Sequence, residues 1–206
     1  MNLSPFLITR QGRQQVLAAT LGLIAGLAIF ILLERGVTPR YTFVTGIDKW
    51  IPFVAWSWFI YVGFFPFVLA LAAYARPDAF MMFAKATLVA FVAGVLCFML
   101  FPEIVPRPDV ATIHSSFIRH HLARMWQLDR ASNGFPSLHV AVTCLACQML
   151  ATPRQRRVTI VLGALICMST LTLKQHTVVD VLGGVLLALA SAFCVRWWHT
   201  ARKELA

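Results

Sequence analysis

The chain has 206 residues, of which 59% are hydrophobic and only 13% are charged, and its mean hydropathy is +0.75. This composition is typical of an integral membrane protein, and the length suits one bundle of helices rather than two domains. The formal net charge is +10. Because the basic residues lie at the ends of apolar segments and not on one soluble face, a nucleic-acid partner is not expected.

Six apolar stretches are long enough, or nearly so, to cross about 30 Å of hydrocarbon. We therefore expect an all-α, polytopic membrane protein whose residues 1–206 form a single membrane domain. The predicted spans are residues 16–33, 52–74, 81–101, 135–151, 158–173 and 177–198. The fourth and fifth are short, which indicates ends that line a cavity or helices that pack inside the bundle. The first stretch is expected to be a retained span rather than a signal peptide, since no small-residue cleavage site follows it.

The distribution of Lys and Arg near the span ends favours one orientation in the membrane by a small margin. Arg154, Arg156 and Arg157 form a basic cluster in a short loop, which favours the cytoplasmic side. With six spans, both termini then lie in the cytoplasm, and the third and fifth connections face outward. We expect a multi-pass protein of the plasma or inner membrane whose chemistry faces the periplasm or exterior.

Three outward segments carry polar residues at the mouths of spans, where ionisable groups are costly and usually mark a site. They read FPEIVPRPD (101–109), NGFPSLHV (133–140) and LKQHTVVDVLGG (173–184). Together they bring six candidate residues to one membrane face: Arg107, Ser137, His139, Lys174, His176 and Asp180.

The spacing of His176 and Asp180 predicts a functional pair. Residues four apart at a helix start share a face, so the carboxylate can accept the imidazole proton and fix its tautomer. The other ring nitrogen is then free to act as a base or a nucleophile.

The remaining candidates suit a phosphate group. His139 falls in the first turn of its own span, after Ser137, where backbone N–H groups form an anion site. Arg107 adds a bidentate fork and Lys174 a point charge. The set predicts phosphoryl transfer through a phosphohistidine, with no metal and no other cofactor required.

A metal centre is the alternative use of the histidines in the outward loop. His114, His120 and His121 lie there, with Asp109 and Asp129 not far away in sequence. Their spacing matches no metal-ligand pattern, so solvated loop histidines are the preferred interpretation.

FPSLH followed by KQHTVVD resembles the type 2 phosphatidic acid phosphatase (PAP2) superfamily, which has a PSGH-type block and an SRxxxxxHxxxD-type block. The motif PSLH is more similar to that of the branch that contains the inositol phosphorylceramide synthases. The resemblance covers roughly residues 101–184 and implies a six-helix bundle. It also implies that His176 is the nucleophile, Asp180 its orienting carboxylate and His139 the acid that protonates the leaving oxygen. By the same resemblance, Arg107 and Ser137 bind phosphate.

The chain departs from the family pattern at two positions. The lysine of the first block falls on Leu100, and the arginine of the third block falls on Thr170, although Ser169 before it matches. We expect Lys174 to restore one of the two lost positive charges at the phosphate.

Three functions remain open on the sequence alone. The first is a lipid-phosphate phosphatase, in which water resolves the phosphohistidine. The second is a transferase that passes a phosphoryl group or phospho-headgroup to a lipid or sugar hydroxyl. The third is a transporter that binds an anion at these charges. The expected partners are a lipid phosphate from the bilayer and the surrounding membrane lipids; the identity of the lipid and assembly into a homo-oligomer are left open.

Overall fold

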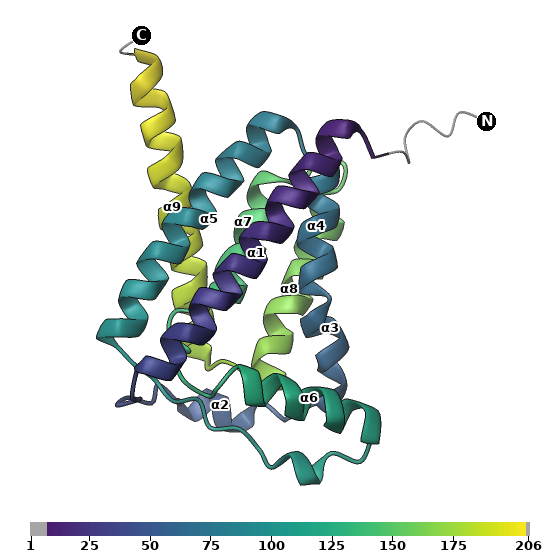
Figure 1. Cartoon of the computed structure of the whole chain (residues 1–206), viewed down its shortest axis with the longest axis vertical. Helices are drawn as coiled ribbons and strands as arrows, with labels where there is room; N and C mark the ends of the chain where they lie inside the picture. The colour runs from purple at the N-terminus through teal and green to yellow at the C-terminus, as the bar shows by residue number, and fades with distance from the viewer. Residues whose placement is uncertain (1–7, 205–206) are drawn as a thin grey trace, which may run out of the picture.

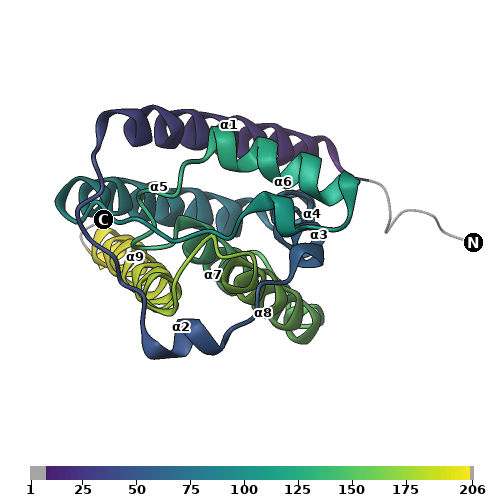
Figure 2. The ribbon, with the colours of Figure 1, turned by 90° about the horizontal axis from the view of Figure 1, so that it is seen from below.

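The computed structural model describes residues 8–204, and within that range the chain is helical with no β-strand. The long helices run alongside one another, while two short ones, α2 and α6, lie across one end of the bundle (Figures 1 and 2). The first turn of α1 and the last turn of α9 lie at the opposite end (Figure 1). The helices are α1 (Arg10–Gly36), α2 (Gly46–Trp50), η2 (Ala55–Ser57), α3 (Trp58–Val62), α4 (Phe64–Tyr74), α5 (Pro77–Leu100), η3 (Val110–Thr112), α6 (Ser116–Leu128), α7 (Leu138–Met149), α8 (Arg156–Thr172) and α9 (Val178–Glu204).

Four helical segments are long and apolar enough to cross a membrane. They are Arg10–Gly36, Ala55–Tyr74, Pro77–Leu100 and Val178–Arg202. These segments correspond to the first, second, third and sixth predicted spans. The fourth predicted span is α7, with 12 residues, and the fifth is α8, with 17. Four of the six predicted spans are therefore helices of spanning length, while crossing of the membrane by α7 and α8 stays a prediction.

The shortness of α7 is explained by its central position. At 1.5 Å per residue, its 12 residues extend about 18 Å, well short of the hydrocarbon thickness. It packs against α4, α5, α8 and α9, and Val140, Ala141, Leu145 and Ala146 are fully buried. A helix surrounded by protein need not match the bilayer.

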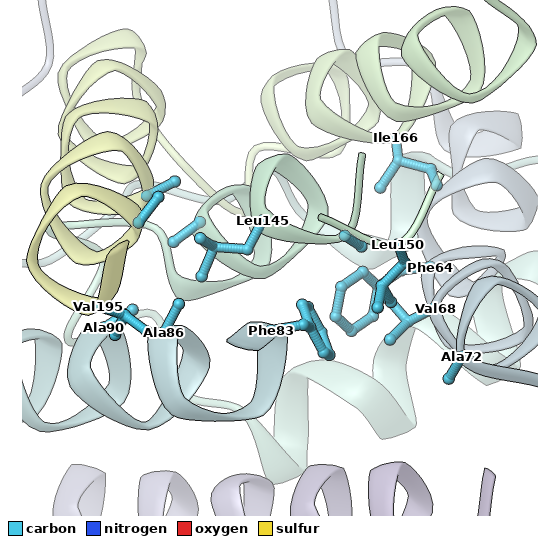
Figure 3. Packing of buried hydrophobic residues seen from close by; sticks show 14 residues of the cluster. Phe64, Val68, Ala72, Phe83, Ala86, Ala90, Leu145, Leu150, Ile166 and Val195 are labelled. Atoms are coloured by element: carbon cyan, nitrogen blue, oxygen red, sulfur yellow. The ribbon is translucent and has the colours of Figure 1, made fainter. Parts of the chain in front are cut away.

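Aromatic and branched side chains from α4, α5 and α7 meet in the core of the bundle (Figure 3). Phe64 and Val68 lie against Phe83 and Leu145, while the facing positions of α5 and α9 are alanines such as Ala86, Ala90 and Ala192. Alternation of large and small residues lets neighbouring backbones approach closely, as is common where apolar surroundings give no hydrophobic drive for helix association.

The helix α9 and the start of α7 approach each other closely. A Cβ atom at Gly184 would lie 2.5 Å from the carbonyl oxygen of Ser137, and one at Gly183 would lie 2.5 Å from the ring of Phe135. Neither position has room for a side chain. The two glycines therefore permit α9 to lie directly on the segment that precedes α7.

We expect Gly184→Ala to destabilise the protein by about 1–3 kcal/mol, because the added methyl group meets a backbone atom and forces α7 and α9 apart. Gly22→Ala in α1 is the matched control, since a Cβ there meets nothing within 4 Å. Alanine is also the better helix former, by roughly 1 kcal/mol. Thermal unfolding in detergent measures both variants. Equal unfolding temperatures for the two would contradict the close packing.

Candidate active site

Backbone hydrogen bonds bring the three predicted segments together at one end of the bundle. Val105 N donates to Ala131 O at 2.7 Å and Asn133 N donates to Glu103 O at 2.9 Å, so the first segment pairs with the residues that lead into the second. Ser137 N donates to Asp180 O at 3.0 Å and joins the second segment to the third. The same end is covered by α2 and α6 (Figure 2).

The turn between α8 and α9 sets the place of His176. Gln175 N donates to Thr170 O at 2.9 Å and Lys174 N donates to Leu171 O at 3.1 Å, the pattern of a Schellman helix end. Lys174 takes the left-handed position of that motif, with φ 55°, where glycine is usual. The chain reverses its direction within three residues, which places His176 at the mouth of the bundle.

His176 and Asp180 form the pair that their spacing predicts. Nδ1 of His176 lies 3.5 Å from Oδ2 of Asp180, whose side chain is fully buried while that of His176 is 15% exposed. The same carboxylate accepts the N–H of Thr177 at 2.7 Å, and Thr177 Oγ1 accepts the N–H of Asp180 at 3.3 Å. This reciprocal cap holds Asp180 in the first turn of α9, with the imidazole in front of it.

His139 lies in the first turn of α7, beside the pair. Its ring stacks on Tyr61, with 4.4 Å between centroids, and tilts against Phe64 at 4.0 Å. Its Nε2 atom is buried with no hydrogen-bond partner, and the imidazole is near enough to His176 for the two to interact electrostatically. A buried ring nitrogen without a partner is a free donor or acceptor for a reacting group.

Ser137 is the N-cap of α7 and is fully buried. Its Oγ accepts the N–H of Val140 at 3.3 Å. The side chain therefore fixes the helix terminus whose free N–H groups suit an anion.

Arg107 is held by Asp129. Its guanidinium donates to the carbonyl and carboxylate oxygens of Asp129, at 2.6 and 3.3 Å, and lies 5.5 Å from the centre of the Trp126 ring. The other Asp129 oxygen accepts from Gln175, the neighbour of His176, at 3.3 Å. Burial raises the pKa of the Asp129 carboxyl, and the Arg107 charge opposes that effect. Because phosphate and carboxylate suit the same guanidinium fork, a phosphate at Arg107 competes with Asp129.

The Lys174 ammonium contacts backbone carbonyl oxygens, whereas the sequence predicts that it binds phosphate. It donates to the carbonyl oxygens of Asp48 and Ile51, at 2.9 and 2.6 Å, at the end of α2. Asp48 also accepts the N–H of Val178, the first residue of α9, at 2.8 Å. These contacts fasten α2 to the turn that carries His176. Phosphate binding by Lys174 stays a prediction and requires the ammonium to leave both carbonyls.

The loop histidines do not gather at one point. His121 packs on Phe117 and Trp58, with centroid distances of 4.2 and 5.3 Å, while His114 is exposed. Within residues 8–204 no group of three or more His, Cys, Asp or Glu side chains is placed to hold a metal ion.

Reasoning from the sequence missed several residues of the site. Glu103 lies in the first segment and is fully buried beside Asp180. The one sequence feature that could have indicated its role is that it is an acid directly after an apolar run. Asn133 has φ 62° and two unpaired side-chain amide atoms. Tyr61, which stacks on His139, stands in an apolar run with no distinguishing pattern.

The three segments lie within the range matched by one known family. The model of the PAP2 superfamily matches residues 42–194, a range that contains all three segments and most of the chain. No significant match is found among curated proteins or solved structures. The chain belongs to the PAP2 superfamily.

Proposed function

We propose that the protein is a membrane phosphatase that hydrolyses a lipid phosphate or diphosphate through a phosphohistidine on His176. Membership of the PAP2 superfamily supports phosphoric ester hydrolysis or phosphoryl transfer in general. The observation that carries the proposal is a pair of imidazoles at neighbouring helix starts. Nδ1 of His176 lies 3.5 Å from the buried Asp180, and Nε2 of His139 is buried without a partner.

In the first step, Nε2 of His176 attacks phosphorus, the bond to the bridging oxygen of the leaving group breaks, and His139 protonates that oxygen, which belongs to an alcohol in a monophosphate and to a lipid phosphate in a diphosphate. Asp180 keeps the proton on Nδ1 and stabilises the positive charge that the phosphorylated imidazole acquires. In the second step, water gives a proton to His139 and attacks phosphorus, and the P–N bond breaks. The protonated form of His139 that this step requires is favoured by an arriving phosphate and by the faces of two aromatic rings.

Phosphate binding is assigned to the start of α7 and to Arg107. The N–H groups that follow Ser137 supply partial positive charge, and the Arg107 guanidinium supplies a bidentate contact once Asp129 is displaced. Positive groups of this kind stabilise the charge of the transferring phosphoryl group.

We infer a six-span arrangement with both termini in the cytoplasm and the site at the periplasmic or exterior face. It would place the substrate tail among apolar helices and its phosphate at the interface. The exposed leucines and isoleucines of α1 and the aromatic side chain of Trp50 at the site end support contact with lipid at these surfaces.

A phosphotransferase is the second candidate. It shares the first step but passes the phosphoryl group or phospho-headgroup to a lipid or sugar hydroxyl in place of water. The motif Pro136–Ser137–Leu138–His139 favours the phosphotransferase, because it resembles the motif of the inositol phosphorylceramide synthase branch. An anion transporter, the third candidate, has no need of a second imidazole at His139.

We expect the purified protein to release free phosphate from at least one member of a lipid panel in excess EDTA, because two histidines and an aspartate perform the chemistry. The panel contains phosphatidate, phosphatidylglycerophosphate, an isoprenyl diphosphate and a phosphorylated glycolipid, each with and without acceptor alcohols. His176→Ala is the control. In sealed vesicles of known orientation, a short-chain impermeant substrate should be processed only from the face that bears α2 and α6.

A new phospholipid in place of free phosphate would favour the transferase. Turnover of no substrate would favour the transporter. Loss of activity in EDTA, with rescue by one metal, would contradict the metal-independent mechanism.

Lys174→Ala separates the two roles of the lysine. Alanine keeps the Cβ atom and leaves the strain of the left-handed turn unchanged, because Lys174 already has φ 55°, whereas glycine would relieve that strain by about 1 kcal/mol and mask the loss of the ammonium. Since the ammonium holds two carbonyl oxygens of the α2 end, we expect Lys174→Ala to lower stability by about 1–3 kcal/mol. KM should change less than about threefold. A tenfold rise in KM, on the order expected for a lost phosphate contact, with an unchanged unfolding temperature would instead establish direct phosphate binding.

A further inference from the structure

Glu103 is an acidic side chain that is fully buried three residues after the end of α5. Its backbone pairs with Tyr41, and its carbonyl accepts the N–H of Asn133. Oε1 accepts the N–H of Phe43 at 3.1 Å. Oε2 is buried, and no group in the described part of the chain donates a hydrogen bond to it. The mechanism proposed above assigns no role to the Glu103 carboxyl.

The unpaired oxygen faces Asp180 across Gly134. A Cβ atom at Gly134 would lie 2.9 Å from Oε2 of Glu103 and 2.9 Å from Oδ2 of Asp180. The two carboxyl groups are close enough to share a hydrogen bond. If both were ionised, two acceptors would face each other in a buried site and repel, so the contact requires one proton.

We propose that Glu103 is a positioning residue that carries this proton and donates it in a hydrogen bond to Asp180, which keeps Asp180 ionised and aimed at His176. The catalytic consequence rests on the function proposed above, whereas the shared proton does not.

The surroundings decide which carboxyl holds the proton. Asp180 accepts the N–H of Thr177 at 2.7 Å and lies 3.5 Å from His176, and both contacts favour its ionised form. Glu103 accepts a single backbone N–H, from Phe43. Burial raises the pKa of Glu103 to about 9, and Asp180 and the negative charge of Asp48 act in the same direction.

The charged and titratable groups around Glu103 come from three elements. Asp180 faces it from α9, with His176 behind, and Asp48 acts on it from α2. Tyr41, in the segment before α2, pairs with it through the backbone while its side chain is exposed. The two nearest charges are therefore acidic and disfavour a second carboxylate.

The proposal gives the direction of the pH dependence. Below about pH 9 the folded protein keeps the Glu103 proton, whereas an unfolded chain releases it above about pH 4.3. The stability that comes from this proton is complete below the unfolded pKa and is lost as pH rises through the folded pKa. Turnover should fall over the upper part of the same range, because ionised Glu103 repels Asp180 from its place behind His176.

Two variants test the proposal in the full-length protein in detergent. Glu103→Gln keeps the shape and an N–H donor but cannot ionise, and Glu103→Leu keeps the volume without a donor. At neutral pH the infrared difference spectrum between the wild type and Glu103→Gln should contain the C=O band of a buried protonated carboxyl, because bands from other buried acids such as Glu34 cancel in the difference. The unfolding temperature of the wild type should fall between pH 7 and 10 relative to that of Glu103→Gln, which isolates the contribution of this one group.

With a turned-over substrate, Glu103→Gln should keep kcat within about threefold of wild type and lose the decline near pH 9, while Glu103→Leu should lose at least about tenfold in kcat. A difference spectrum without the carboxyl band, or a Glu103→Gln variant as impaired as Glu103→Leu, would overturn the proposal. An unchanged basic decline in Glu103→Gln would do the same. If no lipid phosphate is hydrolysed, the infrared and unfolding measurements still decide the question. If they fail while hydrolysis is observed, the proposed function stands without the Glu103 proton.

Discussion

The site depends on the contact between the first turns of α7 and α9. Ser137 N donates to Asp180 O at 3.0 Å. The helices can approach this closely because Gly184 has no side chain; a Cβ atom there would lie 2.5 Å from the Ser137 carbonyl oxygen. The contact brings the imidazole of His139, in the first turn of α7, and that of His176, in the turn before α9, to the same mouth of the bundle. A small change in the distance between these helices would therefore alter the geometry of both histidines together.

Around this contact, acidic side chains accept backbone N–H groups. The half-buried Asp48 accepts from Val178 and the buried Glu103 accepts from Phe43, both in distant segments, while the buried Asp180 accepts from Thr177 in its own turn. The segment before α3 is in this way attached to the first turn of α9, although it lies far from it in sequence. Removing one partner of such a buried acid is costly, so the acids fix the position of the loop as well as the electrostatics of the site.

The sequence predicted the order of the helices better than their lengths. Apolar runs mark each membrane-sized helix. The shortness of the fourth run indicated an end that lines a cavity or a helix packed inside the bundle, and α7 does pack among four other helices; that it has only 12 residues was not predicted. The His176–Asp180 pair was predictable because both residues lie on one helix and a fixed spacing determines their contact. Partners from distant segments were not. Nothing near Arg107 in the sequence points to Asp129, and nothing near Lys174 points to the α2 carbonyls, since both contacts arise only when the loops fold over the end of the bundle.

Phosphorylation of His176 is the step on which the proposed mechanism depends. Acid quenching would destroy the adduct, so the direct measurement is trapping with labelled substrate under alkaline quench, followed by mapping of the label by mass spectrometry. The mechanism predicts an acid-labile, base-stable phosphoryl group on His176 that is absent from His176→Ala. A label that persists in His176→Ala, or an adduct that maps to another side chain, would contradict it.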